Sequence, residues 1–223
     1  MAFFRKNLID ITIFILLQYF FISFTLMYLY SGGNPIHHNA TGYVWNLNYL
    51  SDLGREYFFN GDLNPFWIFY SLSLAIVATG TFLYFYIVSS LVNNNIAKKT
   101  IVLLGFLSAM GYLFLGVFQV DVYLSRHLSA GMLAFYSFYL AEFLLIIFIN
   151  RKTYPMVYYL TLLLILLFLV RISLIYFTKN SELDNQTLLN IKTISQKIIV
   201  YGQIIISTCI LISLKKRALY TGQ

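Results

Sequence analysis

Charged residues are scarce in this 223-residue chain. Asp, Glu, Lys and Arg make up 10% of it and hydrophobic residues 60%, whereas soluble domains carry roughly 25% charged residues. This composition excludes a soluble globular protein. The formal net charge of +7 does not indicate a nucleic-acid partner, because the basic residues fall in short clusters between apolar runs.

Cofactor-binding motifs are also missing from the sequence. Cys209 is the single cysteine, so an intrachain disulfide and a cysteine-ligated metal site are both excluded. No P-loop, dinucleotide fingerprint or haem-attachment motif is present. The sequence therefore assigns no cofactor, and the identity of any cofactor is unknown.

Six apolar segments are long enough to cross a bilayer. A helix of about 20 mostly apolar residues spans the roughly 30 Å hydrocarbon core and satisfies its backbone polar groups internally. No internal repeat or linker divides residues 1–223, so we expect one domain. The sequence predicts an all-α membrane protein, a single bundle of six transmembrane helices at residues 8–30, 65–92, 100–119, 128–150, 154–177 and 194–214.

Basic residues cluster at alternate ends of successive spans. They are Arg5, Lys6, Lys98, Lys99, Arg151, Lys152, Lys215, Lys216 and Arg217. The other connections, residues 31–64, 120–127 and 178–193, mix basic with acidic residues. Because cytoplasmic loops are enriched in Lys and Arg, this pattern predicts that the N- and C-termini are both cytoplasmic.

Residues 31–64 form the one connection long enough to fold over the bundle, and we expect a structured outer loop there. His37 and His38 follow a turn-forming cluster, and Glu56 lies further along the loop. With carboxylates from neighbouring connections, these three residues are possible additional ligands of a divalent cation. Solvent-exposed histidines and ordinary surface carboxylates are the simpler interpretation, and no metal is assigned.

Polar residues of types that catalyse reactions or bind ligands gather at the outer ends of the spans. The candidate outer-face site comprises Ser51, Asp52, Gln119, Asp121, Arg126 and His127. Ser51 or Asp52 can cap a short helix, and an Asp121–Arg126 ion pair can close the hairpin between the third and fourth spans. Alternatively, Asp121 and His127 form an acid–base pair, because histidine exchanges protons near neutral pH.

Four ionisable residues fall within the apolar spans, and Asp10 in the first span is one of them. Glu142 lies in the fourth span and Arg171 in the fifth, and such residues are functional candidates because isolating a charge in hydrocarbon is costly. The alternatives are a neutral, hydrogen-bonded carboxyl for Glu142 and snorkelling to the headgroups for Arg171. Lys197, near the outer end of the sixth span, is also expected to snorkel.

The motifs of residues 45–140 resemble a known family. They comprise the segment NYLSDLG at residues 48–54, Asn64-Pro65 opening the second span, GVFQ at residues 116–119, then His127 and Ala130-Gly131 in the fourth span. This pattern resembles the Frag1/DRAM/Sfk1 group of six-span membrane proteins and the related bacterial and archaeal DUF998 proteins.

The resemblance implies six spans, cytoplasmic termini and a role in a lipid-related process. It carries over onto Ser51, Asp52, Gln119 and His127, with Gln119 standing where some members have proline. Whether these positions are catalytic or structural stays open. The expected location is the cytoplasmic membrane of a bacterium or archaeon.

Three functions remain open at this stage. The first is a non-enzymatic protein that binds or organises lipids, or a subunit or regulator of a membrane assembly, with membrane lipids and membrane proteins as partners. The second is a membrane-embedded hydrolase or lipid-modifying enzyme with an outer-leaflet Ser/Asp/His site, which predicts that His127 and Asp52 lie within hydrogen-bond reach of each other. The third is a transporter or ion pathway through Glu142 and Arg171, which requires a polar passage around Glu142.

Overall fold

The computed structural model describes residues 2–179 and 181–221, with side chains for residues 7–179 and 181–217. This part of the chain is helical and contains no β-strand. Its helices are α1 (Ala2–Leu29), the 3-10 helix η1 (Leu50–Gly54), α2 (Trp67–Ser89), α3 (Asn95–Val117), α4 (Leu124–Phe148), α5 (Pro155–Lys179) and α6 (Asn185–Thr221). The six α-helices are each long and apolar enough to cross a membrane, which confirms the predicted number and fits an integral membrane protein.

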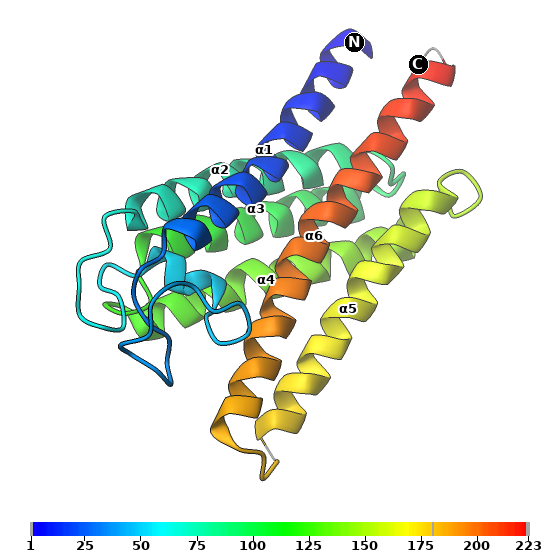
Figure 1. The fold of residues 1–223 in the computed structure, drawn as a ribbon. Coiled ribbons are helices and arrows are strands. Elements are labelled where there is room, and N and C mark those ends of the chain that lie inside the picture. The colour runs from blue at the N-terminus through cyan, green and yellow to red at the C-terminus, as the bar shows by residue number, and fades with distance from the viewer. Residues whose placement is uncertain (1, 180, 222–223) are drawn as a thin grey trace.

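The six helices form a ring in chain order. Each packs against the next along the chain, and α6 closes the ring by packing against α1 (Figure 1). The ends of the chain lie together at one end of the bundle, and the α1–α2 loop covers the opposite end (Figure 1). We call these the termini end and the loop end.

The packing around the ring is uneven. At Gly111 of α3 a Cβ atom would lie 2.3 Å from the backbone nitrogen of Ala134, and the Ser108 hydroxyl donates a 2.8 Å hydrogen bond to the Ala134 carbonyl. Small residues thus bring α3 and α4 into close contact. Only 11% of the most apolar stretch of α5 is buried, against 56% in α2, so α5 stands at the edge of the bundle.

The sixth helix begins earlier than the sequence indicates. The predicted span started near residue 194, and residues 178–193 were expected to be a connection, but α6 begins at Asn185. Asp184 caps it by accepting 3.0 Å hydrogen bonds from the backbone N–H groups of Gln186 and Thr187. The first turns of α6 are too hydrophilic for hydropathy to assign them to the membrane span.

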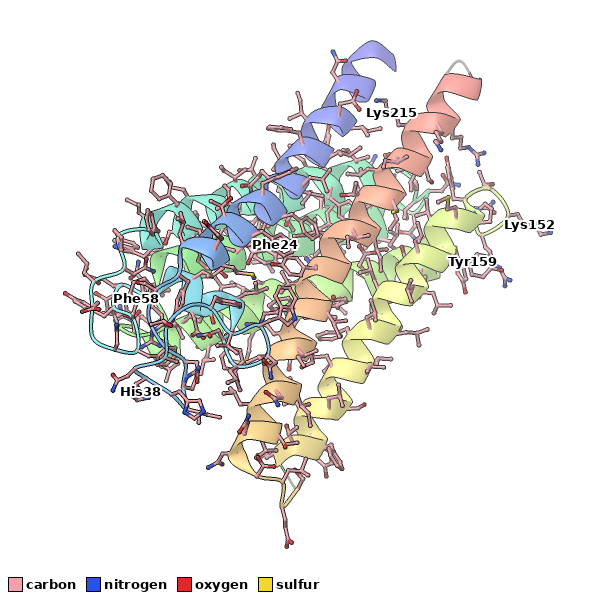
Figure 2. The ribbon with its side chains drawn as sticks, viewed as in Figure 1. Phe24, His38, Phe58, Lys152, Tyr159 and Lys215 are labelled. Atoms are coloured by element: carbon pink, nitrogen blue, oxygen red, sulfur yellow. The ribbon has the colours of Figure 1, made fainter. Side chains whose placement is uncertain are left out.

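Buried asparagines give the α1–α2 loop a fixed shape. The Asn48 side chain accepts a 2.9 Å bond from the Val44 N–H and donates a 2.9 Å bond to the Gly33 carbonyl. The Asn64 side chain donates to the Leu53 and Arg55 carbonyls. The loop is therefore structured, as predicted, with His38 and Phe58 on it in Figure 2.

The termini end carries basic side chains. Lys215 of α6 forms a 2.5 Å ion pair with Asp10 of α1, and Arg151 donates a 2.6 Å hydrogen bond to the Tyr159 hydroxyl. Lys152, Tyr159 and Lys215 lie toward this end in Figure 2. The side chains of Arg5 and Lys6, which the orientation prediction also used, lie outside the described residues.

Candidate functional site

A cavity of about 540 Å³ lies inside the helix ring. All six α-helices line it, as does the segment that enters η1. Most of the lining is apolar or aromatic, and the volume falls within the roughly 300–1,000 Å³ of small-molecule sites. The cavity is therefore the candidate binding site of this fold.

The cavity opens sideways between α4 and α5. Met132 and Tyr136 of α4 and Ile172 of α5 line it, and 54%, 56% and 38% of their respective surfaces are exposed. The two helices meet at the turn of residues 150–154 and diverge toward the loop end (Figure 1). Both helices are long and apolar enough to span a membrane, so we expect this opening to face hydrocarbon.

Residues Tyr49, Leu50 and Ser51 roof the cavity at the loop end. The Leu50 N–H donates a 2.9 Å hydrogen bond to Gln196 Oε1 on α6, which also lines the cavity. The Thr193 hydroxyl donates a 2.6 Å bond to the carbonyl of Asn46. These bonds fix the roof to α6.

Asp52 stabilises the roof through a hydrogen bond to the backbone of Tyr49. Its carboxylate accepts a 2.7 Å hydrogen bond from the backbone N–H of Tyr49, the N-cap residue of η1, so Asp52 stabilises the start of this helix from its third position. Burial raises the pKa of Asp52 to about 6, and burial together with Asp52 raises the pKa of Tyr49. Asp52 does not line the cavity.

The polar lining near the roof includes the guanidinium of Arg171 and the imidazole of His127. Arg171 Nη1 donates a 3.0 Å bond to the Ser195 hydroxyl, which in turn donates to the Lys192 carbonyl. His127 Nδ1 lies 2.7 Å from the Phe118 carbonyl, so Nδ1 carries the proton. Among the described residues, no Asp or Glu lines the cavity.

Further polar groups lie deeper in the cavity. The Gln203 amide donates a 2.8 Å hydrogen bond to the Tyr112 hydroxyl. Gln203 Oε1 is buried and has no hydrogen-bond partner in the described part of the chain. Buried polar groups normally have partners, so this oxygen is suited to bond to a molecule held in the cavity or to water.

The structure brings together two of the six predicted outer-face residues. Ser51 and His127 both line the cavity, from the roof and from the first turn of α4. Gln119 does not line the cavity. Its main-chain carbonyl accepts a 2.8 Å hydrogen bond from the Tyr123 N–H in the turn before α4. Asp52 turns to the backbone of Tyr49 instead of His127, so these residues form no catalytic triad.

The expected pairing of Asp121 is wrong. Its carboxylate accepts bonds of 3.2 Å and 2.9 Å from the backbone N–H groups of Glu56 and Tyr57, so it ties the turn before α4 to the α1–α2 loop. The Arg126 guanidinium is exposed and lies 5.6 Å from the ring centre of Phe118. Asp121 forms no ion pair with Arg126 and no hydrogen bond with His127, whose Nδ1 bonds to the Phe118 carbonyl instead.

The possible metal ligands do not converge. His37 and His38 are exposed, and the His38 ring stacks 5.8 Å from Phe59. Glu56 contributes its backbone N–H to Asp121. In residues 7–179 and 181–217, no three His, Cys, Asp or Glu side chains are arranged to hold a metal ion.

Glu142 and Arg171 do not pair with each other. Glu142 is fully buried, accepts a 2.7 Å hydrogen bond from the Tyr84 hydroxyl and is not part of the cavity lining. Arg171 bonds to Ser195 and lines the cavity. Tyr84, the hydrogen-bond partner of Glu142, lines the cavity as well.

Lys197 is the clearest departure from the sequence prediction. It does not snorkel, because only 1% of its surface is exposed. Its ammonium group donates to the carbonyls of Asn48 and Thr193 and lies 5.4 Å from the ring centre of Tyr43 and 5.3 Å from that of Trp45. Lys197 thus adds to the attachment of the loop to α6.

Sequence reasoning also missed Gln196 and the cavity-lining role of Arg171. Neither has a local signal, because each acquires its role from segments distant in the chain.

Comparison with family models, with curated proteins and with solved structures finds no match. The resemblance of residues 45–140 to the Frag1/DRAM/Sfk1 group stays a prediction.

Proposed function

We propose that this integral membrane protein binds one lipid or similar amphiphile in its central cavity, as a non-enzymatic lipid-binding or lipid-organising protein. The observation that carries this proposal is the lateral opening between α4 and α5. Met132 and Tyr136 line the cavity, and more than half of the surface of each residue is exposed. A molecule can therefore pass from the bilayer into the cavity without crossing water.

The chemistry of the cavity also supports an amphiphile. Its wall is apolar along the opening and polar near the roof, where Arg171 and Gln196 lie. A lipid has the same division between its chain and its headgroup. Basic residues such as Lys152 and Lys215 favour a cytoplasmic termini end, which would place the roof and the headgroup in the outer leaflet.

A lipid-modifying enzyme is the second candidate, because Ser51 and His127 line the same cavity. These residues also belong to the pattern that resembles the Frag1/DRAM/Sfk1 group. The candidate is weaker because the nearby carboxylates of Asp52 and Asp121 are bonded to loop backbone. Release of a fatty acid from a lipid ester that depends on Ser51 would favour the enzyme over the binding protein.

A cavity-filling variant tests the proposal. Gly131 lines the cavity, and a Cβ atom there would meet only Leu115 at 3.7 Å, an ordinary van der Waals distance. Gly131→Leu should therefore fold while filling part of the cavity. Phe143→Leu is the control, because Phe143 lies on the same helix, exposed and outside the cavity.

The assay is native mass spectrometry of protein purified in mild detergent from a lipid-containing membrane. We expect wild type and Phe143→Leu to retain one lipid per chain, and Gly131→Leu to lose it. A wild-type protein without bound lipid would contradict the proposal. Equal retention by wild type and Gly131→Leu would also contradict it.

A further inference from the structure

We infer that the cavity selects an anionic amphiphile whose phosphate or carboxylate group binds Arg171 beneath the roof of Tyr49, Leu50 and Ser51. This inference rests on the proposed lipid-binding function and adds the chemical class of the ligand. It follows from the charge of the lining, from the geometry of the donors and from the position of Arg171 along the cavity.

Arg171 is the single Lys, Arg, Asp or Glu residue among the described residues that line the cavity. The acidic residues nearest to the roof in the chain are already bonded, Asp52 to the Tyr49 N–H and Asp121 to the backbone of the loop. No carboxylate in the described residues lies within ion-pair distance of Arg171. A guanidinium charge without an anionic partner in a membrane protein is costly, and a bound anion would offset that cost.

The donors around Arg171 fit an anion. Arginine presents five N–H donors in a planar fork that matches phosphate and carboxylate oxygens, and here the Ser195 hydroxyl takes a bond from Nη1. In the described part of the chain, the guanidinium makes no other hydrogen bond, so donors of the fork remain for a ligand. Gln196 accepts the Leu50 N–H through Oε1, which leaves its NH₂ group as a donor at the cavity wall.

The position of Arg171 suits a headgroup. It lies eight residues before Lys179 at the end of α5, which corresponds to about 12 Å along the helix. Gln196 and the roof lie beside it at the loop end, whereas Met132, Tyr136 and Phe168 form the apolar wall along the opening. An amphiphile with its anion at Arg171 would extend its chain along this wall toward the bilayer.

Competition between lipids of different headgroup tests the inference. Delipidated full-length protein in neutral detergent is mixed with equimolar phosphatidylglycerol, oleate and phosphatidylcholine, and bound species are quantified by native mass spectrometry. We expect wild type to prefer phosphatidylglycerol or oleate over phosphatidylcholine by roughly tenfold or more, as for one charge-assisted contact. The favoured anionic lipid identifies the recognised group as phosphate or carboxylate.

Variants of Arg171 separate recognition from folding. Arg171→Gln should reduce the anionic lipids to the phosphatidylcholine level, and Arg171→Lys should keep part of the preference because the charge remains without the fork. Arg126→Gln is the control, since Arg126 is an exposed arginine outside the cavity. If Arg171→Gln does not fold, the wild-type preference and the Arg171→Lys variant still decide.

The result that overturns the inference differs from the one that overturns the proposed function. Equal wild-type binding of phosphatidylcholine and phosphatidylglycerol would refute selection of an anion, as would an unchanged preference in Arg171→Gln. If Gly131→Leu still abolished all binding, lipid binding in the cavity would stand. Absence of any wild-type lipid binding would remove both.

Discussion

Replacing Asp52 by Asn should stabilise the protein at neutral pH but not in acid. Burial raises the pKa of this carboxyl group from 3.8 to about 6, against the opposing effects of the Tyr49 N–H, Arg55, Asn48 and Lys197. In the unfolded chain the group loses its proton near pH 4. The folded loop holds the proton up to about pH 6, so the folded state is favoured below this window and loses stability as pH rises through it.

The size of the effect follows from the pKa difference. About two pKa units at 1.36 kcal/mol each give a loss of about 3 kcal/mol in the free energy of unfolding between pH 4 and pH 8. The amide that Asp52→Asn introduces cannot ionise, and its oxygen can still accept the Tyr49 N–H. The variant should therefore escape this loss.

Thermal unfolding of the detergent-solubilised protein measures the difference between variant and wild type at each pH, which cancels the titration of other groups. We expect nearly equal midpoints at pH 4 and a variant midpoint roughly 6–12 °C higher at pH 8. Asp62→Asn, an exposed position of the same loop, should show no such pH dependence. A variant less stable than wild type at pH 8 would refute the reasoning, because it would mean that the carboxylate form is net stabilised in the fold.

Two further stability predictions concern the helix packing. Gly111→Ala should lower the thermal midpoint strongly, because its Cβ would meet the α4 backbone at 2.3 Å, whereas Gly131→Ala, where there is space, should be neutral or stabilising. Equal midpoints for the two glycine variants would contradict the close α3–α4 contact. Tyr84→Phe should cost about 1–3 kcal/mol because it removes the hydrogen bond to buried Glu142. Tyr139→Phe should not destabilise the protein, since the Tyr139 hydroxyl is buried without a hydrogen-bond partner in the described residues. Chemical or thermal unfolding compares the stability of the two tyrosine variants.

The features that the sequence predicts correctly are local. Membrane-spanning length is a property of a continuous apolar stretch, so the six helices follow from hydropathy alone. The contribution of Asp52 to the start of η1 also depends on neighbours, because the N–H from which it accepts a hydrogen bond belongs to Tyr49.

The features that the sequence misses depend on distant partners. Lys197 looks like a snorkelling lysine, and its burial depends on the carbonyl of Asn48, which belongs to the α1–α2 loop. Gln196 likewise finds its partner at Leu50. The exposed apolar side chains of α5, such as Ile172, read as an ordinary lipid-facing surface, and only the divergence of α4 and α5 makes them the wall of a cavity.

Photo-crosslinking with a lipid that carries a diazirine in its acyl chain tests lipid entry between α4 and α5 most directly. The protein is reconstituted into bilayers with this lipid, irradiated and digested, and labelled residues are identified by mass spectrometry. We predict labelling concentrated at Met132, Tyr136 and Ile172 and removed by Gly131→Leu. Labelling as strong at Leu103, on the exposed face of α3, and unaffected by Gly131→Leu would contradict the account.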